Sequence, residues 1–190
     1  MSLLRVLLIS SAFASLTTGC VSLLDATSEG PIEEHQGTRT LGTVIEDENI
    51  ETKISVNLRK ASDTLKNSNI DVVSFNGTVL LVGEVPDQAS KALADQVASK
   101  TRAVRKVYNE LSIAGVSTWV SRYNDAWITT KVSSQMMLAE NFPSSRIKVV
   151  TEQGTVYLMG LVSQTEGEYA VDITKQVYGV EKIVKLFEYI

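Results

Sequence analysis

The chain has few of the residues that catalytic and metal sites require. It contains one cysteine, Cys20, and one histidine, His35, so neither an internal disulfide nor a thiolate or imidazole metal cluster can form. His35 lies in a polar segment before the first predicted domain, where we expect a solvated linker residue. The sequence also has no glycine-rich loop of the kind that cradles phosphates. It therefore predicts a binding protein rather than an enzyme, with no cofactor and no metal.

An excess of basic residues is also missing. Lys and Arg number 18 against 22 Asp and Glu, which gives a net charge of −4. A protein that binds nucleic acid generally needs cations to replace counterions, so we expect no nucleic-acid partner. The acidic residues fall mostly at predicted helix starts or on polar faces, where they favour the helix dipole. We expect structural roles for Asp47, Glu48, Glu51, Asp87 and Asp95.

The N-terminus has no apolar run long enough to span a bilayer. Residues 1–5 are short and positive, and residues 6–16 are apolar over fewer than the roughly 20 residues that a span needs, so residues 1–19 are typical of a signal peptide. The sequence that ends at Cys20 resembles a bacterial lipobox, which implies acylation of Cys20, as by palmitate, and Val21 favours the outer membrane. The alternative is a chance cysteine near a conventional cleavage site.

The chain after residue 45 contains two copies of one pattern. Residues 50–54 recur as 128–132, residues 76–83 as 153–160, and residues 104–107 as 180–183, in the same order. Such ordered similarity predicts a duplicated domain. We expect a tether at residues 20–45, a first domain at 46–114, a linker at 115–123 and a second domain at 124–190. The short linker favours domains that pack on each other.

Each copy follows the order helix, strand, strand, helix, strand. Asn76-Gly77 predicts a tight hairpin turn because both residues tolerate positive φ, and Gly83 and Gly160 predict a bulge or a close backbone approach late in a strand. The elements expected in the first copy are 47–61, 70–75, 78–85, 87–101 and 106–113. Those expected in the second copy are 126–141, 147–152, 155–162, 165–178 and 181–189. The fold class is α+β: two tandem αββαβ domains, each with a three-stranded mixed sheet packed against two helices.

The first helix of the second copy has two apolar stripes. We expect Asn124 or Asp125 to cap its N-terminus. Ile128, Val132 and Met136 recur at helical spacing with Gln135 and Ala139, which predicts a core face. A second stripe lies beside it at the same period. It contains Trp127, Lys131, Ser134 and Leu138, and we interpret it as an interaction surface.

The two αββαβ modules, with their Gly-x-Val-x-Leu-type hairpins and the run 124–132, resemble the BON domain family, and in particular its dual-BON outer-membrane lipoproteins. This resemblance implies a protein without enzymatic activity on the periplasmic face of the outer membrane. It also implies binding of anionic phospholipid, notably phosphatidylglycerol, through the first helix of the second domain. A role in outer-membrane integrity and stress response, at the cell-division site, follows from the same resemblance.

The residues themselves support a site on this helix. Trp127, Met137 and Leu138 correspond in the first copy to Asn49, Arg59 and Lys60, so the fold does not require apolar residues there. A tryptophan suits the bilayer interface, and lysine or hydroxyl groups suit a lipid phosphate. The residues predicted to bind phospholipid are Trp127, Ile128, Thr130, Lys131, Ser134, Met137 and Leu138. Two alternatives stay open: the stripe packs against the other domain or residue 119, or it binds a protein of the outer-membrane assembly or division machinery.

Overall fold

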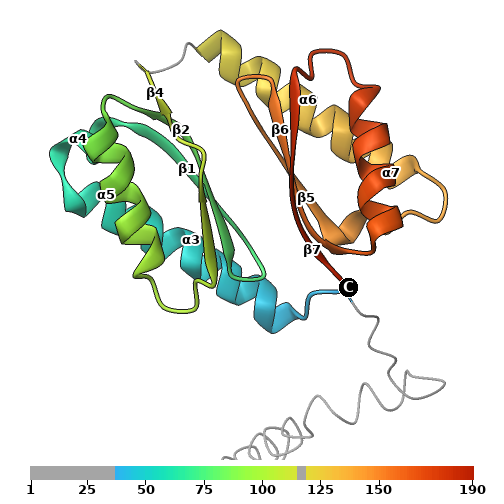
Figure 1. Ribbon diagram of the computed structural model, residues 1–190, viewed down its shortest axis with the longest axis horizontal. Coiled ribbons are helices and arrows are strands. Elements are labelled where there is room, and N and C mark those ends of the chain that lie inside the picture. The colour runs from blue at the N-terminus through green and yellow to red at the C-terminus, as the bar shows by residue number, and fades with distance from the viewer. Residues whose placement is uncertain (1–36, 115–118) are drawn as a thin grey trace, which may run out of the picture. The chain divides into compact units, whose positions relative to one another are not determined.

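The computed structural model describes residues 37–114 and 119–190, which belong to one compact unit (Figure 1). The predicted signal peptide, Cys20 and His35 lie outside the described residues. The first domain contains α3 (Leu41–Ala61), α4 (Asp63–Asn67), β1 (Asn69–Phe75), β2 (Thr78–Val85), α5 (Gln88–Ser99), β3 (Lys106–Asn109) and β4 (Ser112–Ile113). The second contains α6 (Trp119–Leu138), the 3-10 turn η2 (Ser144–Arg146), β5 (Ile147–Glu152), β6 (Thr155–Val162), α7 (Gln164–Lys175) and β7 (Lys182–Tyr189). The α+β class and the two αββαβ units are confirmed.

Both sheets are mixed, as expected. In each, an antiparallel hairpin (β1–β2 or β5–β6) is joined by a parallel last strand (β3 or β7) on the second hairpin strand. The final strand of the first domain, expected to be continuous over 106–113, is interrupted between β3 and β4, which both pair with β2. The interruption lies near Gly83, whose φ of 113° departs from strand geometry. In the second domain β7 pairs with β6 along its whole length.

The two hairpin turns have the predicted geometry. Asn76 and Gly77 have φ values of 52° and 73°, and Gln153 and Gly154 have φ values of 48° and 71°. Two successive positive φ angles characterise the type I′ turn, which matches the twist of the flanking strands. The close approach predicted at Gly83 is also present, because a Cβ there would lie 2.1 Å from the carbonyl oxygen of Asn69.

Both long helices begin earlier than the sequence predicted. α3 starts at Leu41 with Thr40 as its N-cap, and α6 starts at Trp119, so the prediction that Asn124 or Asp125 caps α6 is wrong. The Asp125 carboxylate instead accepts hydrogen bonds, both 2.9 Å, from the backbone N–H groups of Gln153 and Gly154 in the β5–β6 turn. It satisfies turn amides rather than helix amides, and it fixes the helix on its hairpin.

Asp47 plays the same part in the first domain. It lies within α3, not at its start, and it is only 3% exposed. It accepts from the N–H groups of Asn76 and Gly77 and from the Ser74 hydroxyl, at 2.7–2.9 Å, and it pairs with Arg39 at 3.0 Å. Burial alone would raise the pKa of Asp47, but these hydrogen bonds lower it on balance. The structural role expected for this carboxylate is therefore specific: it ties helix to turn.

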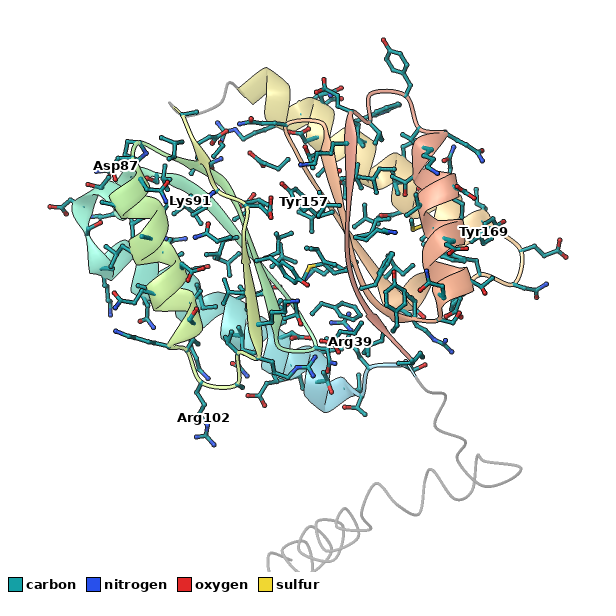
Figure 2. All side chains as sticks on the ribbon, in the orientation of Figure 1. Arg39, Asp87, Lys91, Arg102, Tyr157 and Tyr169 are labelled. Atoms are coloured by element: carbon teal, nitrogen blue, oxygen red, sulfur yellow. The ribbon has the colours of Figure 1, made fainter. Side chains whose placement is uncertain are left out.

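Each sheet has two buried faces. α3 and α5 cover one face of the first sheet, and α6 and α7 cover one face of the second (Figure 1). The other two faces pack on each other through one apolar cluster, in which Tyr157 points between the sheets (Figure 2). Its buried members are Phe75, Leu80, Val82, Tyr157, Met159 and Leu186. Burial here raises the pKa of Tyr157 to about 12. The domains thus share a core through their sheets.

Polar contacts surround this shared core. Glu188 on β7 accepts from Asn76, Thr78 and Arg105 of the first domain. Lys148 on β5 pairs with Glu51 on α3 at 2.9 Å. These charged contacts hold the two sheets in one register. Within the described residues, no helix is long and apolar enough to cross a membrane.

Candidate functional site

α6 lies on the outer face of the second sheet, with one side in the core. Ile128 and Val132 have no exposed surface and Met136 is 1% exposed, and all three belong to the core between the helices and the sheet. The Thr129 hydroxyl donates to the Thr151 hydroxyl on β5 at 2.8 Å. These residues fix the rotation of α6, so the opposite side of the helix faces solvent. The predicted core face is confirmed.

The second stripe is exposed along its length. Trp127 is 45% exposed, Met137 73% and Leu138 84%, while Lys131 and Ser134 between them are also exposed. At about 1.5 Å per residue, Trp127 and Leu138 lie roughly 16 Å apart along the helix axis. The stripe therefore presents an apolar group at each end and polar groups in the middle.

The predicted set contains one residue that is buried and one exposed residue whose hydroxyl already donates within the helix. Ile128 is fully buried in the core, so we remove it from the candidate surface. Thr130 is exposed, but its hydroxyl donates to the Ala126 carbonyl of its own helix at 2.9 Å. The hydroxyl that remains available near Lys131 is that of Ser134. The surface that the structure brings together is Trp127, Lys131, Ser134, Met137 and Leu138, and we call it the α6 surface.

The first domain provides an internal comparison. Asp47 and Asp125 occupy matching places, since each binds its own hairpin turn, and this aligns α3 with α6. On that alignment the partners of Trp127, Met137 and Leu138 are the exposed polar residues Asn49, Arg59 and Lys60. α3 exposes other apolar residues, such as Leu41 and Ile45, but at these three positions it is polar. The exposed apolar side chains of α6 there therefore indicate an interaction surface rather than a need of the fold.

The alternative in which this stripe is buried against the other domain does not fit the structure. The domains pack through the sheet faces opposite to the helices, and Leu138 and Met137 stay largely exposed. Trp127 keeps nearly half of its surface in solvent. The side chain of residue 119, the other proposed neighbour, lies outside the described side chains. α6 is therefore not an interdomain wedge.

One carboxyl group at the domain junction has unusual electrostatics. Glu152 ends β5, and its Oε1 is buried without a hydrogen-bond partner among the described residues. Burial, and then the negative charges of Glu84, Asp125 and Asp71, raise the pKa of Glu152 to about 7. Nearby, the buried Glu84 accepts from the Asn69 and Gln153 amides at 3.2 Å and 2.7 Å. Glu152 thus holds a proton at mildly acidic pH inside the junction.

Two exposed aromatic residues were missed as candidates from the sequence. Tyr123 lies on α6 one helical turn before Trp127 and is 76% exposed. Tyr178 follows α7 and is 89% exposed. The next residue, Gly179, lies against α6, since a Cβ there would be 3.2 Å from Ile128 Cδ1, beside Trp127. The repeat comparison could have found Tyr178, because Arg102 occupies its place in the first copy.

Comparison with known proteins identifies relatives of the whole chain. The BON domain profile matches residues 46–115 and 124–190. Over 172 residues the chain is 33% identical to the outer membrane lipoprotein DolP of Haemophilus influenzae, covering 90% of this chain and 89% of that protein. It is 32% identical over 153 residues to a 21 kDa hemolysin of Actinobacillus pleuropneumoniae, covering 80% and 78%. It is 30% identical over 146 residues to the osmotically-inducible protein Y of Escherichia coli, covering 75% and 72%.

Proposed function

The chain belongs to the BON domain family and is a dual-BON protein similar to DolP. From this membership we propose that its α6 surface binds anionic phospholipid, notably phosphatidylglycerol. The protein would do so as a lipoprotein on the periplasmic face of the outer membrane. Its similarity to an outer membrane lipoprotein over most of both chains supports the outer-membrane location.

The observation that carries the proposal is the exposure of Trp127, Met137 and Leu138 at positions where the equivalent helix of the first domain has exposed polar residues. Trp127 can enter the interface with its ring among acyl chains and its N–H toward the headgroups. Lys131 lies one helical turn away and offers an ammonium group to a lipid phosphate. Inserting the exposed parts of the three apolar side chains contributes a few kcal/mol at about 25 cal/mol per Å².

Binding through the α6 surface alone has a low affinity, and the predicted lipid anchor at Cys20 would raise the apparent affinity. Gly37, the first described residue, lies beside Arg146 and Ile190 in the second domain, at the end where α6 leads into β5. The chain from Cys20 to that point can extend at most about 3.5 Å per residue, or roughly 60 Å. An acylated Cys20 would thus keep the α6 surface within a short distance of the bilayer, at a high effective concentration.

Support of outer-membrane integrity at the division site is part of the same proposal. A lipid-docking lipoprotein could concentrate where anionic phospholipid concentrates. The second candidate is a protein adaptor that uses the α6 surface to bind a component of outer-membrane assembly or division. The same exposed apolar residues favour it, so lipid and protein partners must be separated by experiment.

Tryptophan fluorescence tests the proposal directly. In a Trp119→Phe variant of residues 21–190, Trp127 is the single reporter. Vesicles of phosphatidylcholine with phosphatidylglycerol should shift its emission to the blue, and phosphatidylcholine vesicles alone should not. An unchanged spectrum with both would contradict lipid docking and favour the adaptor.

A further inference from the structure

A pocket lies between the C-terminal half of α7 and the start of β7. It has a volume of about 380 Å³. Its apolar floor consists of Val171, Val180 and Ile183, and its polar rim consists of Lys175, Lys182, Lys185 and Glu181. Lys185 shares the α7 face of β7 with Ile183, whereas Lys182 alternates to the other face with Val184. The ammonium groups that accompany the apolar floor are therefore those of Lys175 and Lys185. We call this the lysine pocket.

The charges of the lysine pocket are only partly balanced within the protein. Lys175 pairs with Asp172 at 3.0 Å, and both side chains are largely exposed. Among the described residues, neither Lys182 nor Lys185 forms an ion pair. The rim is therefore cationic in a chain whose net charge is −4. Like charges held close together repel one another, and an anion in the pocket would relieve that repulsion.

The first domain shows that the fold does not require this cluster. The strand registers align the two domains, because Thr78 pairs with Lys106 and Thr155 with Lys182. Lys185 and Lys175 then correspond to Asn109 and Ser99. Asn109 donates to the Lys91 carbonyl at 2.9 Å and so joins β3 to α5. A neutral residue serves the packing there, so the fold does not require a lysine at the position of Lys175 or Lys185, whereas Lys182 corresponds to Lys106.

The lysine pocket also lies near the α6 surface. The turn that forms its upper edge, residues 177–181, rests on α6 through Gly179 and Ile128. Trp127 follows directly on that helix, and Tyr178 projects from the turn with 89% of its surface exposed. The turn that carries the exposed Tyr178 therefore joins the cationic pocket to the helix that carries Trp127, a combination that suits the interface of a charged bilayer.

We propose that the lysine pocket holds the phosphate of an anionic phospholipid in the bilayer on which α6 docks. The ammonium groups of Lys175 and Lys185 would donate to the phosphate oxygens, and the apolar floor would receive the glycerol backbone. This inference rests on the proposed function and deepens it. The surface of contact extends from α6 across the α7–β7 turn, and the pocket supplies most of its positive charge.

Substitution by the residues of the first domain tests the pocket with little risk to the fold. The double variant Lys175→Ser/Lys185→Asn is compared with Lys60→Ser/Lys106→Asn, which makes the same charge change on the first domain. Both are made in residues 21–190, which contain the whole compact unit. Binding is measured by flotation with phosphatidylcholine vesicles, with and without phosphatidylglycerol. Each lysine near an anionic surface contributes about fivefold in affinity, so the pocket variant should bind the charged vesicles about 25-fold more weakly.

The control variant should bind within about twofold of the wild type. Equal loss in both variants would overturn the pocket, because only net charge would then matter. Wild-type affinity in the pocket variant, with binding lost in Trp127→Glu, would overturn the pocket and leave the α6 proposal standing. Failure of the wild type to bind either vesicle would overturn both. The last experiment replaces the vesicles with inorganic phosphate and measures the NMR chemical shifts of the backbone amides of residues 180–183. If phosphate changes these shifts as much as charged vesicles do, the pocket is a site for free phosphate, which would contradict the lipid assignment.

Discussion

Glu152 makes the stability of the protein depend on pH in an uncommon direction. Its pKa is raised from 4.5 to about 7 by burial and by the nearby carboxylates of Glu84, Asp125 and Asp71. Between these two values the folded protein keeps a proton that the unfolded chain has lost. The contribution of Glu152 to the unfolding free energy therefore falls as pH rises from about 4.5 to 7, and this contribution is level above that.

The size of the effect follows from the shift. One pKa unit corresponds to 1.36 kcal/mol, so the raised pKa of Glu152 is worth at most about 3 kcal/mol between the two ends of the window. A Glu152→Gln substitution keeps the shape of the side chain and removes the charge. The variant should match the wild type near pH 4.5 and be more stable by about 2–3 kcal/mol at pH 8. Asp47 and Glu188 have lowered pKa values, so the stability that they contribute is lost at more acidic pH, outside this window.

Urea unfolding at a series of pH values measures the difference. Comparing the two proteins cancels every group that they share, including His35. Glu140→Gln, which neutralises an exposed glutamate of the same domain, is the matched control and should follow the wild type. A constant difference between Glu152→Gln and wild type from pH 4.5 to 8 would refute the reasoning, because it would show that Glu152 titrates alike in both states.

Three further substitutions test how the fold is held together. Asp125→Ala leaves two hairpin N–H groups without their acceptor and should cost about 2–3 kcal/mol in urea unfolding, whereas an equal stability would show that the turn needs no helix carboxylate. Gly83→Ala would place a Cβ 2.1 Å from the Asn69 carbonyl oxygen at a φ of 113°, and should lower Tm sharply, while Gly42→Ala in α3 should leave Tm unchanged or raise it. Met159→Ala, in the shared core, should cost about 2–5 kcal/mol and unfold both domains in one transition; separate transitions would contradict a shared core.

The sequence predicted the duplication and the strands well because their signals are local and repeated. Asn76-Gly77 requires a tight turn wherever it is placed between two apolar runs, and the Ile128 stripe requires a buried helix face. The predicted strands 147–152 and 155–162 match the structure residue for residue. These elements depend on neighbours within a few positions, so a single sequence contains the needed information.

The start of α6 was predicted wrongly because an aspartate can accept hydrogen bonds either from the first turn of its own helix or from another part of the chain. An aspartate near the beginning of a helix usually accepts from the helix's own N–H groups. Asp125 accepts from a turn 28 residues later along the chain, and that choice depends on tertiary structure. In the same way, α3 extends to Leu41 because Thr40 caps it, while the weak apolar pattern of residues 41–45 resembled a tether.

The prediction that the domains pack on each other is confirmed, but the sheet faces through which they pack were not predicted. β2 is buried on both faces: Val79 and Leu81 contact the helices, while Leu80 and Val82 contact the other sheet. A strand with an unbroken apolar run needs cover on both sides. Which element covers the second face of β2 depends on how the two domains pack, and this cannot be predicted from the strand alone. The α6 surface was found because the repeat separates what the fold needs from what it does not.

The most direct test of lipid docking is vesicle flotation of residues 21–190, with and without Trp127→Glu. The wild type should float with vesicles that contain phosphatidylglycerol and stay in solution with phosphatidylcholine alone. The variant should stay in solution with both, while its circular dichroism and Tm match those of the wild type. Equal flotation of the two proteins would contradict docking through α6, and no flotation of the wild type would contradict lipid binding itself.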